Sequence, residues 1–230
     1  MNKNLISLFY ISIVFSIYSP SFADSEVTIE TDVGLVSDYV YRGLSRSDSG
    51  WALQGTFTAR HNGGVYMGVF MSSLDSDFNR HSVESEFFGG YTFSKGAYDY
   101  DLSISYDALM GGAGEGYFET RASISRDFGV AYIKTGIAYT PWDREIGEGN
   151  STYVYSDFDV PLPISNIVPM AVSLHLGYAN FEGPLDKWDW GVGIYMEVVG
   201  VEFGVKYSDV KDGNPLLSEN RLTFNLRKYF

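Results

Sequence analysis

Apolar and polar residues alternate along the chain in twelve segments, which average about nine residues in length. Alternation with a period of two places every second side chain on the same face of a β-strand. About ten residues is the length that a tilted strand needs to cross a bilayer. The segments lie within residues 27–41, 53–59, 65–71, 83–93, 98–106, 118–124, 131–139, 154–160, 170–178, 188–196, 201–207 and 222–230. The pattern predicts an all-β protein, a transmembrane antiparallel β-barrel of about 12 strands.

The connections between these segments alternate between short and long. The short ones are glycine-containing turns, at residues 61–64, 94–97, 127–129 and 199–200. The longer, polar or glycine-rich ones span residues 43–50, 73–80, 110–115, 141–149, 180–187 and 211–220. Outer-membrane barrels have short periplasmic turns and longer extracellular loops, so both termini should be periplasmic. The connection Pro161–Pro169 is longer than this rule predicts for a periplasmic turn.

A soluble β-sandwich would also show alternation, because one face of each strand would point into its core. The positions of the aromatic residues favour the membrane barrel. Two aromatic belts separated by aliphatic residues are typical of a protein that spans a bilayer. One predicted belt, at the extracellular rim, contains Tyr39, Tyr41, Trp51, Tyr178, Trp188 and Trp190. The other, at the periplasmic rim, contains Tyr91, Phe93, Tyr98 and Tyr100.

The chain ends on a strictly alternating segment, LTFNLRKYF, whose last residue is Phe230. This ending resembles the C-terminal recognition signal of outer-membrane proteins, which implies the barrel assembly machinery as a partner. A final strand must pair with the first strand to remove both sheet edges, because unpaired backbone groups are not tolerated in lipid. We therefore expect Phe230 to close the barrel.

The first 23 residues have the organisation of a secretory signal peptide. Lys3 precedes an apolar run, Leu5–Tyr18, which is too short for a membrane-spanning helix. Ser21, Phe22 and Ala23 then form a cleavage site with small residues at both ends. We expect residues 24–230 to form one outer-membrane barrel in a Gram-negative bacterium, in contact with outer-membrane lipids.

Charge and cysteine content exclude several other functions. Lys3 is the only charged residue before position 24, so residues 24–230 carry 29 acids, 15 bases and a net charge of −14. Such an acidic chain offers no basic patch for nucleic acid. The chain contains no cysteine, so it can form neither disulfides nor thiolate metal sites.

The stretch GLVSDYVYRGLSRSDSGWALQG, residues 34–55, carries a recognisable motif. It resembles the hallmark of the bacterial Gcw_chp family, also labelled the TorF family of porins. The matching residues are Ser37, Asp38, Tyr39, Arg42, Gly43 and Ser45. The resemblance implies an outer-membrane channel, and it implies no particular ligand.

The motif also has a physical interpretation. Asp38 and Arg42 share the parity of the predicted lumen face, so they could pair inside the extracellular mouth. Gly43 would permit a turn into the first loop, and Ser45 could hydrogen-bond the backbone of that loop. These residues then either clamp the loop or contact a passing solute.

The predicted lumen face carries fifteen acids and seven bases, a surplus of eight negative charges. The acids are Glu30, Asp32, Asp38, Glu84, Glu86, Asp99, Asp101, Asp107, Glu119, Asp127, Asp157, Asp159, Asp189, Glu197 and Glu202. The bases are Arg42, Arg60, Arg121, Lys134, Lys206, Arg221 and Arg227. This balance predicts a weakly cation-preferring channel for small hydrophilic solutes. The alternative is a structural or adhesive barrel whose lumen is plugged by side chains.

The sequence gives little indication of catalysis. Ser173 and His175 come nearest to a nucleophile and a base, but residues two apart on a strand lie too far apart for a direct hydrogen bond. The aspartates at positions 99, 101 and 107, and at 157 and 159, could bind a cation, although solvated lumen charge explains them equally well. We expect no enzyme activity, no cofactor and no metal.

Overall fold

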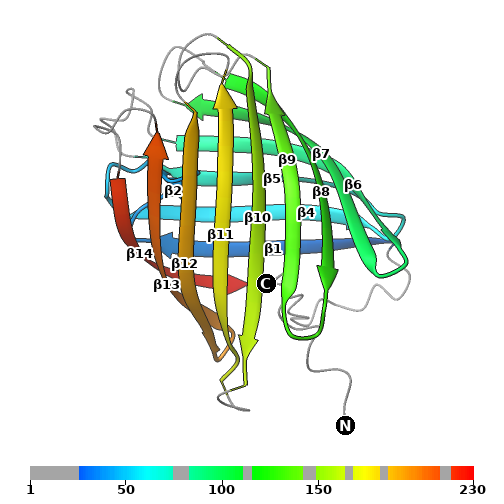
Figure 1. Ribbon diagram of the computed structural model, residues 1–230. Coiled ribbons are helices and arrows are strands. Elements are labelled where there is room, and N and C mark those ends of the chain that lie inside the picture. The colour runs from blue at the N-terminus through cyan, green and yellow to red at the C-terminus, as the bar shows by residue number, and fades with distance from the viewer. Residues whose placement is uncertain are drawn as a thin grey trace.

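Twelve strands form one closed antiparallel barrel in the computed structural model, in which successive barrel strands pair with each other and the last pairs with the first (Figure 1). The structure describes residues 26–74, 83–110, 116–141, 149–163, 168–181, 186–212 and 219–230. The barrel strands are β1 (Val27–Val36), β4 (Ala52–His61), β5 (Val65–Ser73), β6 (Val83–Lys95), β7 (Tyr98–Met110), β8 (Gly116–Asp127), β9 (Tyr132–Thr140), β10 (Ser151–Leu162), β11 (Met170–Phe181), β12 (Lys187–Val198), β13 (Val201–Asp212) and β14 (Glu219–Tyr229). The predicted twelve-stranded barrel is confirmed.

The last strand closes the barrel against the first. Leu226 of β14 lies opposite Leu35 of β1 in an antiparallel register. The amide of Phe230 donates a hydrogen bond to the carbonyl of Thr31 at 2.8 Å, so the last residue of the chain takes part in the closure. Closure satisfies the backbone groups that would otherwise form two open edges.

The outer face of the barrel is apolar and exposed, as the alternation predicts. Met67 in β5 is 66% exposed and Leu176 in β11 is 56% exposed. Trp51 and Trp188, at the end where the longer connections lie, are 66% and 60% exposed. Tyr91, at the opposite end, is 44% exposed. In the described residues we find no helix long and apolar enough to span a membrane.

The turns at the end of the barrel that holds the C-terminus are short. Val199 and Gly200 connect β12 to β13 with φ angles of 51° and 73°. Positive φ at both central residues is typical of a type I′ turn, which matches the twist of the flanking strands. These two residues therefore fix the register of β12 and β13.

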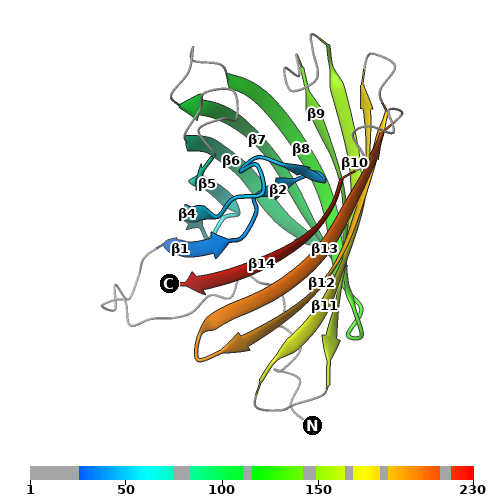
Figure 2. The ribbon, with the colours of Figure 1, turned by 90° about the vertical axis from the view of Figure 1, so that its left-hand side faces the viewer.

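The first connection differs from the sequence prediction. We expected the first strand to continue to Tyr41 and the extracellular loop to begin at Gly43, but β1 ends at Val36. Residues 37–51, which we call the mouth hairpin, instead fold into the lumen around two short strands, β2 (Val40–Tyr41) and β3 (Leu44–Ser45). Figure 2 shows β2 between the wall of β5–β8 and the wall of β10–β13. The assignment of Tyr39 and Tyr41 to the outer aromatic belt was therefore wrong.

Several sequence predictions fall wholly or partly outside the described residues. The signal peptide at residues 1–23 is one of them. Most of the longer connections after the first also lie partly outside the described residues. The structure does not describe residues 75–82, 111–115, 142–148, 182–185 and 213–218. Within Pro161–Pro169, Pro161 and Leu162 belong to β10, and residues 164–167 are not described.

Candidate functional site

The mouth hairpin extends into the lumen, and its tip rests against the wall formed by β12 and β13. Arg42 and Gly43 form the turn between β2 and β3, with φ angles of 48° and 82°. A Cβ atom on Gly43 would lie 2.6 Å from the Cβ atom of Val210 in β13 and 3.0 Å from that of Asp189 in β12. The positive φ and the close approach both require glycine here. Gly43 thus lets the tip contact the wall.

Arg42 fixes the hairpin to the far side of the barrel. Its Nη2 atom donates to both carboxylate oxygens of Glu119 in β8, at 2.8 and 2.7 Å. The guanidinium also lies over the rings of Tyr153 and Tyr41, at 4.3 and 4.8 Å from their centroids. Burial raises the pKa of the Tyr41 phenol above its ordinary value, so Tyr41 stays neutral. Burial lowers the pKa of Arg42, but the charge of Glu119 and its hydrogen bonds oppose this, and the net shift is upward, so the charge of Arg42 is retained.

Glu119 is the centre of a charged network that links the hairpin to three wall strands. Its side chain is fully buried. Besides Arg42, it accepts hydrogen bonds from Nε of Arg121 at 2.5 Å and from the hydroxyl of Thr140 in β9 at 2.8 Å. Arg121 in turn donates to Glu86 in β6 at 2.6 Å. Every carboxylate in this network has a cationic partner, which offsets the cost of removing it from water.

Arg46 forms a second anchor that the sequence analysis missed. It pairs with Glu84 in β6, donates to the Tyr117 hydroxyl at 3.0 Å, and lies 3.8 Å from the centroid of the Tyr41 ring. We had placed Arg46 in an extracellular loop and had left it out of the lumen charges. The residues that point to such an anchor are Glu84 and Glu119, because carboxylates buried in a barrel wall require cationic partners.

Asp38 and Arg42 do not pair with each other as expected. The Asp38 carboxylate accepts from Arg221 in β14 at 2.9 Å, and from the hydroxyls of Ser45 and Ser47 at 2.5 and 3.0 Å. The reason is the early end of β1, which places Asp38 at the base of the hairpin and Arg42 at its tip. Ser45 accepts from the amide of Ser49 at 3.1 Å, which is the backbone hydrogen bond that the motif suggested.

The motif residues Ser37 and Tyr39 hold the base of the hairpin. The Ser37 hydroxyl accepts from the amide of Phe224 in β14 at 2.9 Å, and the Tyr39 amide donates to the Ser47 hydroxyl at 2.8 Å. The Tyr39 ring meets Phe70 of β5 edge-on, with centroids 6.0 Å apart. The hairpin therefore contacts strands on all sides of the lumen.

His175 belongs to a cluster of four side chains in the wall below the hairpin tip. Its Nδ1 lies 2.6 Å from the Asp157 carboxylate, and its Nε2 lies 3.0 Å from Asp189 and 2.8 Å from the Tyr153 hydroxyl. Both ring nitrogens of His175 thus contact side chains of the neighbouring strands β10 and β12. The same Tyr153 contacts Arg42, so the cluster adjoins the hairpin.

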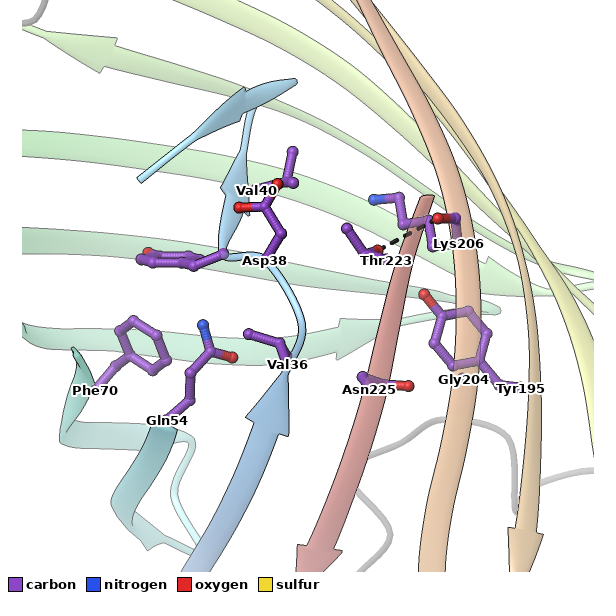
Figure 3. A pocket seen from close by; sticks show the side chains of 11 residues that line it. Val36, Asp38, Val40, Gln54, Phe70, Tyr195, Gly204, Lys206, Thr223 and Asn225 are labelled. Atoms are coloured by element: carbon purple, nitrogen blue, oxygen red, sulfur yellow. Dashed lines mark hydrogen bonds between the residues drawn. The ribbon is translucent and has the colours of Figure 1, made fainter. Parts of the chain in front are cut away.

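Within the described residues, three cavities around and below the mouth hairpin are large enough to hold water or a solute. The largest, of about 460 Å³, lies between the hairpin tip and the wall of β10–β13. The second, of about 420 Å³, is lined by β4–β10 and shares Glu86, Arg121, Lys134 and Tyr155 with the first. The third, of about 220 Å³, adjoins the base of the hairpin; Figure 3 shows Asp38 and Val40 on one side of it and Lys206 and Tyr195 on the other. A polar, partly enclosed chamber therefore lies beneath the hairpin.

The remaining predicted lumen acids include several that bind neutral partners. Asp99 accepts from Ser94 at 2.5 Å and Asp101 accepts from Tyr66 at 2.8 Å. Asp107 accepts a hydrogen bond from the Ser105 hydroxyl at 3.5 Å, and Glu202 accepts one from the Asn225 amide at 3.0 Å. Asp159 lies opposite Ser173 in the register of β10 and β11, and Glu197 lies opposite Glu202 in that of β12 and β13. In the described part of the chain, no group of three or more ligands is placed to hold a metal ion.

The closed barrel, apolar outside and polar inside, has the architecture of outer-membrane porins. Two solved structures share this fold over nearly their whole length. One is the KdgM porin, with a TM-score of 0.58 and 10% sequence identity, covering 87% of this chain and 99% of the other. The other is the NanC porin, with a TM-score of 0.54 and 9% identity, covering 87% and 98%. At such low identity these similarities show the fold alone.

The family assignment rests on the sequence. Residues 21–228 match the family described as "Bacterial protein of unknown function (Gcw_chp)". The chain therefore belongs to the Gcw_chp family. The resemblance of residues 34–55 is thereby confirmed for that family, and the TorF porin label stays a prediction. No curated protein matches the chain significantly.

Proposed function

We propose that the protein is an outer-membrane channel for small hydrophilic solutes, whose extracellular mouth is narrowed by the mouth hairpin. The observation that carries this proposal is a closed barrel with an apolar outer face and polar cavities of about 460 and 420 Å³ in its lumen. An exposed apolar outer face suits lipid, and a hydrated lumen lined by charged and hydroxyl groups suits polar solutes.

The charge distribution supports a weak preference for cations. Near the mouth, acids are paired with arginines, as in Arg42–Glu119, Arg46–Glu84 and Arg221–Asp38. Closer to the periplasmic end, Asp99 and Asp101 accept hydrogen bonds from the hydroxyls of Ser94 and Tyr66, which are neutral groups and do not offset a carboxylate charge. A surplus of negative charge in a narrow tube concentrates cations and repels anions.

The KdgM porin has also been solved in complex with disordered oligogalacturonate, which is a polyanion. The acid surplus predicted for the lumen of the present chain disfavours such a ligand. We therefore propose a different solute preference despite the shared fold.

The experiment is the reversal potential of the folded protein in planar bilayers across a KCl gradient. Cation preference is expected near 0.1 M salt and should fade near 1 M, because the screening length falls from about 10 Å to about 3 Å. Anion preference at low salt would contradict the charge argument.

A structural or adhesive barrel is the second candidate, and the mouth hairpin favours it. The hairpin contacts β6 and β8 through its arginines and β13 through Gly43, so it spans the lumen. If the hairpin never leaves this position, the barrel conducts little. Absence of current steps, both in the native protein and in variants that release the hairpin, would favour this function.

The remaining parts of the proposal concern location and partners. We propose that the barrel lies in the outer membrane in contact with its lipids, and that the assembly machinery recognises its C-terminal strand and Phe230. We also propose that it is not an enzyme. Unchanged phenotypes for Ser173→Ala and His175→Ala would support this last point, and loss of a hydrolytic activity in either variant would contradict it.

A further inference from the structure

Several aromatic rings in the lumen lie directly over a glycine of the adjacent strand. At each of these glycines a Cβ atom would come within 2.0 to 2.7 Å of ring or hydroxyl atoms of the neighbouring aromatic residue. The pairs are Tyr66 with Gly90, Phe88 with Gly68, Tyr153 with Gly177, Tyr155 with Gly136, and Tyr195 with Gly204. Figure 3 shows the last of these pairs, with the Tyr195 ring beside Gly204 of β13.

These pairs determine how the rings are presented to the lumen. For Tyr155, the Cζ, Oη and Cε1 atoms lie 2.5, 2.5 and 2.7 Å from the position that a Cβ atom of Gly136 would occupy. Only glycine leaves this space, so the ring rests against the backbone of β9 instead of standing away from the wall. The ring lies nearly parallel to that of Tyr153, with centroids 5.8 Å apart, and it still lines the lumen cavities.

Among these rings, Tyr155 is best placed to meet a solute. Arginines cover two of the others, because Arg60 lies 4.7 Å from the centroid of Tyr66 and Arg42 lies 4.3 Å from that of Tyr153. Tyr155 instead lines both of the larger cavities, where they adjoin beneath the mouth hairpin. Each of these cavities has a volume typical of small-molecule sites, about 300–1,000 Å³.

The groups around Tyr155 supply hydrogen bonds without a strong net charge. Lys134 and Arg121 line both cavities with it, and Ser123 and Ser125 line the smaller of the two. The acids that line the two cavities are Glu86, Asp99, Asp101, Asp157 and Asp189, and the arginines and lysines are Arg42, Arg60, Arg121, Lys134 and Lys206. His175 also lines the larger cavity, where it contacts Asp157 and Asp189. Five carboxylates thus face five arginines and lysines, so this chamber, unlike the predicted lumen face as a whole, selects strongly for neither sign of charge.

We propose that this chamber is a binding site for neutral saccharides, with Tyr155 as the platform on which a sugar ring stacks. A pyranose ring has an apolar face of C–H groups that fits a flat aromatic ring, and hydroxyls at its edge that fit alternating donors and acceptors. A charged solute would leave part of the balanced wall unpaired, which costs affinity. The site names the solute class of the proposed channel and in that sense rests on the proposed function.

The test is titration calorimetry of the folded, detergent-solubilised protein with maltotriose, a neutral trisaccharide. Saturable binding is expected. Tyr155→Ala should weaken it about tenfold, equivalent to about 1.4 kcal/mol, and Tyr155→Phe, which keeps the ring, should change it by less than about threefold. Tyr139→Ala is the matched control, since Tyr139 lies on the exposed outer face of the neighbouring strand β9, and it should bind like the native protein.

Gly136→Ala tests the geometry without removing the ring. Its new methyl group should displace Tyr155 and weaken binding about as much as Tyr155→Ala, and the double variant should show no further loss. Heat-dependent migration in SDS gels shows that each variant is folded. An additive loss in the double variant would overturn the platform role of Tyr155.

Two comparison ligands test the solute class. Trigalacturonate and tryptophan should both bind more weakly than maltotriose, and tighter binding of either would overturn the assignment to neutral saccharides. Calorimetry requires no current, so the two proposals can fail separately. A barrel that conducts ions but does not bind maltotriose would overturn the saccharide site alone. A barrel that binds it but conducts nothing would overturn the channel and leave the site.

Discussion

Replacing Arg42 with alanine should release the mouth hairpin and increase conductance. Arg42 is the contact between the hairpin tip and β8, through two hydrogen bonds to Glu119 at 2.7 and 2.8 Å. It also provides cation–π contacts to Tyr153 and Tyr41. Alanine removes all of these contacts, while the wall strands keep their own ladder of hydrogen bonds.

The size of the effect follows from these contacts. A hydrogen bond to a charged group contributes about 1.5–3 kcal/mol, and a desolvated cation–π contact about 0.5–2 kcal/mol. Glu119 keeps Arg121 and Thr140 as partners, so the variant does not leave a buried charge unpaired. The docked hairpin should lose about 2–4 kcal/mol, which raises the ratio of undocked to docked hairpin between about thirtyfold and several hundredfold.

Single-channel recording in planar bilayers measures this change directly. Arg42→Ala should show larger or more frequent current steps than the native protein, and Arg42→Ala combined with Arg46→Ala should show a further increase. Arg126→Ala is the matched control. Arg126 lies 5.1 Å from the centroid of Tyr98 and donates to its hydroxyl at 3.1 Å, but it extends from β8 on the same face as the outward-facing Ile124.

If the native protein, the Arg42 variant and the double variant all show the same conductance, the hairpin does not limit flow through the barrel. If Arg126→Ala raises conductance as much as Arg42→Ala does, the effect is a general loosening of the barrel. Either result would refute the role given to the hairpin.

Two further predictions concern backbone geometry and the outer face. Gly43→Ala should displace the hairpin tip and make Arg42 and Arg46 accessible to trypsin, because φ is 82° and Val210 leaves no room for a methyl group; Gly96→Ala, with φ of 66° and open space around it, should not. Leu174→Lys, on the outward face of β11, should reduce the free energy of unfolding in liposomes by about 2–4 kcal/mol if it lies near the midplane. Ser173→Lys, one residue earlier and directed into the lumen, should cost clearly less, and equal losses would contradict the assignment of faces.

Local alternation was sufficient to predict the strands of the barrel. It arises from the pleat itself, so a run such as Trp188, Trp190, Val192, Ile194 and Met196 shows its outward face without knowledge of its neighbours. The pairing of β1 with β14 was also accessible, because a closed barrel leaves the last strand no other partner. Tyr155 gave no such signal, since its site depends on Gly136 in a different strand and on cavities formed by several strands.

The mouth hairpin could not be predicted from alternation, because a period of two continues through it. Tyr39 and Tyr41 keep the parity of β1, yet the strand ends at Val36 and both tyrosines turn inward. The path of the hairpin is decided by carboxylates on distant strands, which require cationic partners. Glu84 and Glu119 are buried in β6 and β8, and an unpaired carboxylate there would cost several kcal/mol. The first loop supplies the two arginines that satisfy them, so its fold is set by charges on strands far away in the sequence.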